Sequence, residues 1–185
     1  MQTNIYFVRH AEPNYENHND RLRELTAKGE EDAKKVAEYL TDKQIDAVLS
    51  SPYRRAIDTV QPFARKVFMP IVAVEDFRER AVADEWIEDW NDFSKKQWED
   101  FDYKLPGGES LNEVKERVVR GFELVLEQYK GKNIAVGIHG TALAVLLNHL
   151  DSAFGYEQFK AITMPWTVCV KVEDGTVKIV KEQSN

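Results

Sequence analysis

The stretch Asn4-Ile5-Tyr6-Phe7-Val8-Arg9-His10, close to the start of the chain, decides the fold. Residues 4–8 form a short apolar and β-branched run, which predicts a central strand covered on both faces of a sheet. In open α/β sheets, ligands bind beyond the carboxyl ends of such strands. Arg9 and His10 therefore lie where a site is expected. An arginine suits an anionic oxygen, and a histidine can act as base, nucleophile or ligand. On position alone, a surface turn that happens to contain both residues is an equally good interpretation.

Strands and helices alternate along the rest of the chain. Further strands are predicted at residues 45–49, 70–74, 134–138, 168–172 and 177–180. Helices are predicted from 26 to 40, from 51 to 68, from 110 to 131 and from 142 to 150. Thr26 and Ser51 are the expected N-caps of the first two helices. The pattern predicts an α/β protein: a three-layer α/β/α sandwich with a mostly parallel central sheet and an edge hairpin, formed by residues 1–185 as one domain.

Composition narrows the classes of function. The chain of 185 residues is 43% hydrophobic and 31% charged, which is typical of a globular protein. Its one cysteine, Cys169, excludes an internal disulfide and favours a cytoplasmic location. No signal peptide or membrane-length apolar run is visible, so no membrane partner is expected. The net charge of -7 argues against nucleic acid as a partner, and the oligomeric state stays open between monomer and homodimer.

Residues 76–108 interrupt the alternation of strands and helices. They contain three of the four tryptophans and no strand signal, so we expect one or two amphipathic helices packed on the body as a lid or insertion. Twelve acidic and five basic residues lie between positions 75 and 109, where the negative charge is concentrated. An anionic substrate would therefore need a local cluster of positive groups elsewhere.

Three predicted strands end in residues suited to such a cluster. The first ends in Arg9-His10, and the second leads through Ser51-Pro52 into a helix whose first turns carry Arg54 and Arg55. The strand at 134–138 ends in His139-Gly140-Thr141 and enters another helix. Two helix N-termini, arginines and two histidines at one edge of the sheet form a suitable site for a phosphoryl group.

These residues resemble a known family. The order and spacing of six landmarks are similar to those of the histidine phosphatase superfamily, which includes phosphoglycerate mutase-like and acid phosphatase-like enzymes. The landmarks are Arg9-His10-Ala11-Glu12, Leu25-Thr26-x-x-Gly29, Ser51-x-x-x-Arg55-Ala56, Phe77-Arg78-Glu79, Pro106-Gly107-Gly108-Glu109-Ser110 and His139-Gly140. The resemblance covers nearly the whole chain.

The resemblance implies a reaction through phosphohistidine. His10 would attack phosphorus and become phosphorylated, and water would then release phosphate. Arg9, Arg55 and His139 would hold the phosphoryl oxygens, where positioning and charge neutralisation do most of the catalytic work. Because these cations supply the positive charge, no metal and no cofactor is expected. The partner would be a phosphorylated small molecule.

Glu79 matches the position of the family's acid, which would protonate the leaving alkoxide and later accept a proton from water. Glu75, Glu85 and Glu88 are neighbouring alternatives in the acidic segment.

Further polar residues have weaker sequence support. Substrate contacts are predicted for Gly140, Thr141, Asn14 and Asn17. The remaining histidines, His18 and His149, match no motif and are interpreted as structural or exposed.

Two departures from the family bear on the reaction. Ala11 stands where the commonest motif has glycine, and Pro13 replaces a frequent serine or threonine. The mutases also carry a longer insert and C-terminal tail than this chain. We therefore expect a small broad-specificity phosphatase acting on phosphomonoesters. The alternatives are a bisphosphoglycerate-dependent phosphoglycerate mutase and a phosphate-binding or interaction module without catalysis.

Overall fold

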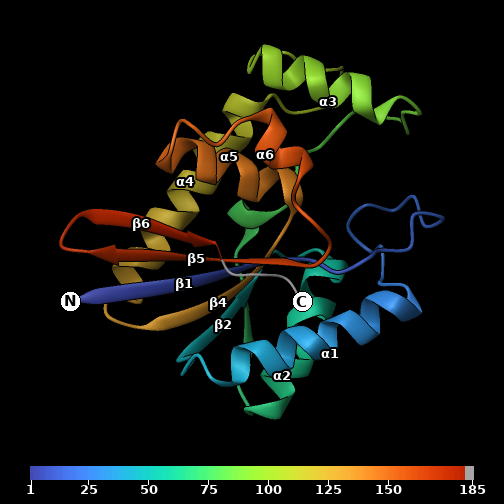
Figure 1. Cartoon of the computed structure of the whole chain (residues 1–185). Coiled ribbons are helices and arrows are strands. Elements are labelled where there is room, and N and C mark those ends of the chain that lie inside the picture. Colours follow the sequence, from blue (N-terminus) through green and yellow to red (C-terminus); the bar gives the residue numbers. More distant parts are fainter. Residues whose placement is uncertain (182–185) are drawn as a thin grey trace.

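A six-stranded sheet runs through the molecule with the strand order β3-β2-β4-β1-β5-β6 (Figure 1). The computed structural model describes residues 1–181. The strands are β1 (Gln2–Arg9), β2 (Ala47–Ser50), β3 (Ile71–Ala73), β4 (Asn133–Ile138), β5 (Trp166–Glu173) and β6 (Thr176–Lys181). Strands β1 to β4 are parallel, whereas β5 pairs antiparallel with β1 and β6 antiparallel with β5. The predicted mostly parallel sheet with an edge hairpin is confirmed.

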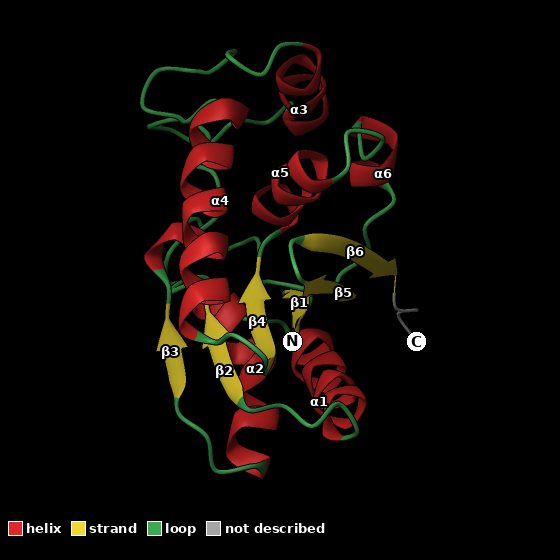
Figure 2. Ribbon diagram, turned by 90° about the vertical axis from the view of Figure 1, so that its left-hand side faces the viewer, coloured by secondary structure: helices red, strands yellow, loops and turns green. Residues whose placement is uncertain are grey.

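Helices cover both faces of this sheet. They are α1 (Ala27–Thr41), α2 (Arg54–Lys66), α3 (Trp90–Glu99), α4 (Leu111–Gln128), α5 (Gly140–Leu150), α6 (Tyr156–Lys160) and the short 3₁₀ helix η1 (Glu75–Phe77). Figure 2 shows α1 and α4 on opposite sides of the strands. Helices α1 and α2 pack on one face, and α4 and α5 on the other. The predicted three-layer sandwich is therefore confirmed.

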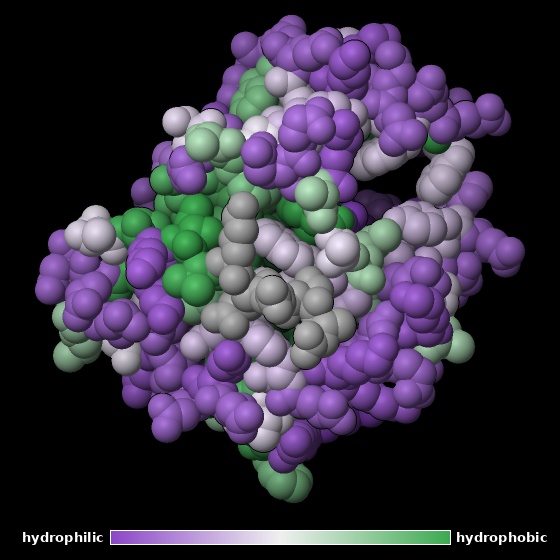
Figure 3. All heavy atoms as spheres, viewed as in Figure 1, coloured by the Kyte–Doolittle hydropathy of each residue, from purple (hydrophilic) through white to green (hydrophobic). Residues whose placement is uncertain are grey.

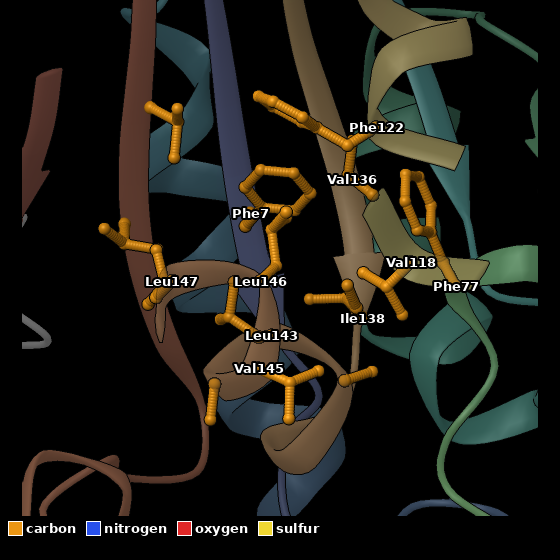
Figure 4. Packing of buried hydrophobic residues seen from close by; sticks show 14 of the residues in the cluster. Phe7, Phe77, Val118, Phe122, Val136, Ile138, Leu143, Val145, Leu146 and Leu147 are labelled. Carbon is orange, nitrogen blue, oxygen red and sulfur yellow. The ribbon is translucent and has the colours of Figure 1, made fainter. Parts of the chain in front are cut away.

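The alternation of side chains along β1 connects the two layers of helices. Ile5 and Phe7 point into the core formed with α4 and α5, whereas Tyr6 and Val8 belong to the core formed with α1 and α2. Figure 4 shows Phe7 among the buried side chains of the first core. Ile5, Phe7 and Val8 are fully buried, and burial of each such side chain contributes about 1.5–3 kcal/mol. Burial of these side chains on both faces of β1 therefore fixes the register of this central strand.

One predicted helix start is confirmed and one is wrong. The Thr26 hydroxyl accepts the Gly29 N–H at 3.0 Å and caps α1. Ser51 does not cap α2, which begins at Arg54 with Tyr53 as its N-cap. The reason is a contact with a residue distant in sequence, because the Ser51 hydroxyl lies 2.7 Å from Nε2 of His139. Helix α5 begins at Gly140, two residues earlier than predicted, and α6 had no counterpart in the sequence analysis.

The segment 76–108 contains one α-helix, α3, which Figure 1 shows above α5 and α6. Trp98 of α3 stacks on Phe159 of α6 with ring centroids 5.4 Å apart. Phe93 and Gln97 are the buried anchors of the inner face of α3. Within residues 1–181, no helix has the length and apolar character needed to cross a membrane.

Gly137 of β4 allows α2 to approach the sheet closely. A Cβ atom there would lie 2.8 Å from the carbonyl oxygen of Ala56 and 2.7 Å from Oγ of Ser50. We predict that Gly137→Ala lowers the free energy of unfolding by about 1–3 kcal/mol, because the backbone of α2 must move. Urea denaturation measures this loss. Gly155→Ala is the matched control, since its nearest atom would be 3.7 Å away. Equal stability of the two variants would contradict the close approach.

Candidate active site

Backbone pairing brings the candidate residues together beyond the strand ends. The N–H of His10 donates to the carbonyl of Ile138 at 3.0 Å, and the N–H of Ser51 donates to that of Gly137 at 2.8 Å. The segments after β1 and β2 therefore continue along β4 up to His139. The rings of His10 and His139 lie with their centroids 5.2 Å apart. The structure therefore brings the two histidines together at one edge of the sheet.

The ring of His10 is fixed by a hydrogen bond to its own neighbour. Nδ1 lies 2.8 Å from the carbonyl oxygen of Ala11, and a carbonyl can only accept, so Nδ1 carries the proton. The Ala11 N–H in turn donates to Oγ1 of Thr59 at 2.9 Å, which ties this turn to α2. The lone pair of the neutral ring is therefore on Nε2.

Both histidines are held in the neutral form. Burial lowers the pKa of His10 well below its usual value, and the charges of Arg55 and Arg9 lower it further. Burial likewise lowers the pKa of His139, with Arg55 as the next cause. A buried imidazole beside guanidinium groups is costly to protonate. At neutral pH, Nε2 of His10 is thus an unprotonated nitrogen among cations.

Arg55, which is 3% exposed, places its guanidinium beside that nitrogen. Its Nε lies 3.4 Å from Nε2 of His10. Asp20 holds the other end of the guanidinium: its carboxylate lies 3.0 Å from Nη2, and its carbonyl oxygen accepts from Nη1. The loop that precedes α1 therefore orients Arg55 against the nucleophilic edge of His10.

Arg9 approaches the same region from β1. Its Nη1 donates to the carbonyl of Ile162 at 2.7 Å and to that of Thr163 at 3.3 Å. The guanidinium passes so close to Gly140 that a Cβ there would lie 2.9 Å from Nε. Glycine at the start of α5 is thus explained by the approach of Arg9.

His139 forms a hydrogen bond that fixes its tautomer. Its Nε2 lies 2.7 Å from Oγ of Ser51, which also accepts the N–H of Tyr53 at 3.2 Å. We infer that the Ser51 hydroxyl donates to Nε2, because the opposite arrangement leaves the serine proton without an acceptor. The proton of His139 is then on Nδ1, which has no hydrogen-bond partner among residues 1–181. A buried donor is available there for an anionic oxygen.

Glu79 lies at the N-terminus of α5. Its Oε1 accepts the N–H groups of Arg80 and Ala142 at 2.8 and 3.1 Å, and its Oε2 accepts that of Thr141 at 3.1 Å. Three backbone donors thus fix the carboxylate beside the site, and Oε2 retains a lone pair. Glu85 and Glu88 are exposed, and Glu75 pairs with Arg21 on the surface.

A partly buried ion pair positions the backbone that carries Glu79. Arg117 of α4 binds Glu109 through two hydrogen bonds of 2.8 Å and donates to the carbonyls of Asp76, Arg78 and Glu79. Burial opposes ionisation of Glu109, but the bonds from Arg117 and from the N–H of Ala81 lower its pKa. The pair acts as a brace between α4 and the segment that ends in Glu79.

Comparison with known proteins identifies the family of the chain. Residues 5–181 match the model of the histidine phosphatase superfamily (branch 1). The chain belongs to this superfamily. It is 29% identical over 127 residues to the uncharacterized phosphatase PhoE of Bacillus subtilis, covering 69% of this chain and 64% of that protein. It is also 29% identical over 167 residues to the metal-independent phosphoserine phosphatase of Arabidopsis thaliana, covering 82% and 70% of the two chains.

Solved structures share the fold. YhfR of Bacillus stearothermophilus superimposes with a TM-score of 0.79 at 21% identity, over 97% of this chain and 96% of that chain. A phosphoglycerate mutase of Bacillus anthracis gives the same TM-score at 17% identity, over 98% and 92% of the two chains.

In this member of the superfamily, the other predicted contact residues have structural partners. The amides of Asn14 and Asn17 donate to the carboxylate of Glu24 at 2.8 and 2.7 Å. These two bonds lower the pKa of Glu24 to about 2. Thr141 is buried and gives its N–H to Glu79. The structure brings Arg9, His10, Arg55, Glu79 and His139 together, whereas Asn14 and Asn17 shape the loop before α1.

Neither Arg23 nor the Arg117–Glu109 brace is predicted from the sequence, and Ser51 is predicted only as a helix cap and as part of a family motif. Arg23 is 7% exposed, and its charge contributes to lowering the pKa of His10. It precedes the Leu25-Thr26 motif, but nothing in the local sequence marks it as inward-facing. Across residues 1–181, no three or more histidine, cysteine or acidic side chains are arranged to hold a metal ion.

The tautomer of His139 gives a first test of the site. In nitrogen-15 spectra at pH 7.5, we expect the Nδ1–H form in the wild type and a shift toward the Nε2–H form in Ser51→Ala. Turnover should fall roughly 10- to 100-fold, as expected for the loss of one hydrogen bond to a charged oxygen. Ser50→Ala is the control, because the Ser50 hydroxyl is buried without a partner in the described chain. An unchanged spectrum in Ser51→Ala would contradict this assignment.

The lowered histidine pKa values also predict how stability depends on pH. Below pH 6.5 the unfolded chain binds protons at His10 that the folded chain refuses, so stability falls as the pH drops toward the folded pKa. Between pH 7.5 and 5.5, His10→Gln should lose about 1 kcal/mol less than the wild type. Urea denaturation at the two pH values checks this. His149→Gln, an exposed histidine, should behave like the wild type; an equal loss in His10→Gln would refute the burial argument.

Proposed function

We propose that this histidine phosphatase hydrolyses small phosphomonoesters through a phosphoryl group carried on Nε2 of His10. One observation supports this most strongly. Nδ1 is committed to the carbonyl of Ala11, so the lone pair of a neutral, buried imidazole is on Nε2, 3.4 Å from Nε of Arg55. A neutral nitrogen among fixed cations is suited to attack an anionic phosphoryl group.

In the first step, the Nε2 lone pair forms a bond to phosphorus as the bond to the leaving oxygen breaks. Arg9, Arg55 and Nδ1–H of His139 bind the phosphoryl oxygens and balance their charge. Glu79 gives its proton to the leaving alkoxide. Oε2 is the atom suited to carry that proton, because it accepts one backbone N–H whereas Oε1 accepts two.

In the second step, water attacks phosphorus from the side that the alcohol has left. Its proton passes to the Glu79 carboxylate, and the P–N electron pair returns to Nε2. Phosphate leaves, and both His10 and Glu79 regain their initial protonation states. The arginines supply the positive charge in both steps, so the proposal uses no metal and no cofactor. Cys169 is the one cysteine in the sequence and is a buried free thiol, so we expect a reducing, cytoplasmic setting.

Relatives named as phosphatases support hydrolysis, while the mutase relatives keep a phosphoglycerate mutase as the second candidate. The two reactions differ in what they require. A phosphatase releases phosphate from a monoester with no other phosphorylated compound present, whereas a bisphosphoglycerate-dependent mutase needs the bisphosphate. Phosphate release from phenyl phosphate and 3-phosphoglycerate without bisphosphoglycerate supports our proposal. A strict bisphosphate requirement would overturn it.

The role of Glu79 has its own test. Glu79→Gln should lose roughly 10²–10⁴ in kcat/KM on alkyl phosphates and much less on aryl phosphates, whose leaving groups need no acid. Glu88→Gln, a change to an exposed acid in the same segment, should leave both rates unchanged. Equal losses on both substrates would rule out proton donation by Glu79.

His10→Ala should abolish turnover, and Arg55→Ala should lower it roughly 100-fold or more.

A further inference from the structure

Two half-exposed aromatic rings flank a buried cation beside the site. Tyr15 is 50% exposed and Trp86 is 53% exposed, although both are large aromatic residues. The guanidinium of Arg23 lies 5.6 Å from the ring centroid of Tyr15 and 5.7 Å from that of Trp86. The mechanism above uses none of these three residues.

Contacts place this group next to the phosphate-binding arginines. The Asp20 carboxylate that binds Arg55 also accepts from Nη1 of Arg23 at 3.2 Å. On the other side, the Tyr15 hydroxyl lies 3.7 Å from the sulfur of Met164. Met164 directly follows Thr163, whose carbonyl accepts from Arg9. The aromatic rings and Arg23 are thus connected to Arg55 through Asp20, and to the carbonyl that binds Arg9 through Met164.

Trp86 also connects two segments of the chain that are distant in sequence. Its ring stacks on His18 with centroids 4.1 Å apart and planes 3° from parallel. His18 belongs to the loop before α1, and Trp86 to the segment that leads into α3. Figure 3 shows the surface hollowed between the part of the molecule that carries α3 and the loop side below it. The stack therefore joins the loop before α1 to the segment that leads into α3.

We propose that Tyr15, Trp86 and Arg23 form an outer subsite that binds a planar aromatic ring in the leaving group of the substrate. This inference rests on the proposed phosphatase function and names the class of phosphomonoester that the site prefers. Exposed aromatic surface is unfavourable in water, and a flat ring packed on it gains both burial and aromatic pairing. A saturated ring of similar size gains burial but lacks the pairing geometry.

Matched phosphonates test the subsite without turnover. Benzylphosphonate and cyclohexylmethylphosphonate carry the same charge on rings of similar size, and only the first ring is flat and aromatic. Calorimetric titration of the wild-type protein should show benzylphosphonate binding roughly 3- to 10-fold more tightly. Trp86→Leu and Tyr15→Leu should each reduce that ratio toward one. Phe68→Leu, a change to an aromatic residue that is 95% exposed at the end of α2, should leave it unchanged.

The outcomes separate this proposal from the proposed function. Equal affinity for the two phosphonates would overturn the subsite. The absence of binding by both phosphonates would overturn it as well. A preference that survives both variants would overturn it as well, because the rings would then serve only to hold the two segments together. The corresponding phosphate esters report the chemistry: if neither releases phosphate while the phosphonate preference persists, the subsite stands and hydrolysis does not.

Discussion

The parallel pairing of β1 with β4 is the constraint on which the rest of the structure depends. Arg9 is aligned with Ile138, so the two strands end together and deliver His10 and His139 to neighbouring positions. Both strands are buried on both faces, and a shift of register would move their apolar side chains out of two separate cores. Packing of the hydrophobic core thus determines the distance between the two histidines.

Electrostatics at the site follow from that placement. The chain has a net charge of -7, yet Arg9, Arg55 and Arg23 surround a buried pair of histidines. Backbone carbonyls orient Arg9, and Asp20 binds both Arg55 and Arg23. Burial and the charges of these arginines lower the pKa of His10, so its ring stays neutral. The net charge of the chain does not attract anions, so binding depends on this short-range cluster of arginines. Such a cluster suits a site that must bind a phosphoryl group and release phosphate.

Site residues that belong to short motifs are predictable from the sequence, whereas residues whose role depends on distant contacts are not. Arg9-His10 and His139 were predicted because each follows an apolar run that can only be a buried strand. Ser51 was misinterpreted as a cap, since its true partner, His139, is 88 positions away. Arg23 and the Arg117–Glu109 brace have no local signal, because their burial arises only when loops and α4 pack against the site.

We propose that Nε2 of His10 carries the phosphoryl group, since Nδ1 is bound to the carbonyl of Ala11. The most direct test is to quench the enzyme in alkali during turnover of a phosphomonoester, because phosphohistidine survives base. Peptide mapping and comparison with the two phosphohistidine isomers then locate the phosphoryl group. We expect phosphate on the peptide that contains His10, as the Nε2 isomer. The Nδ1 isomer, or phosphate on any other residue, would contradict it.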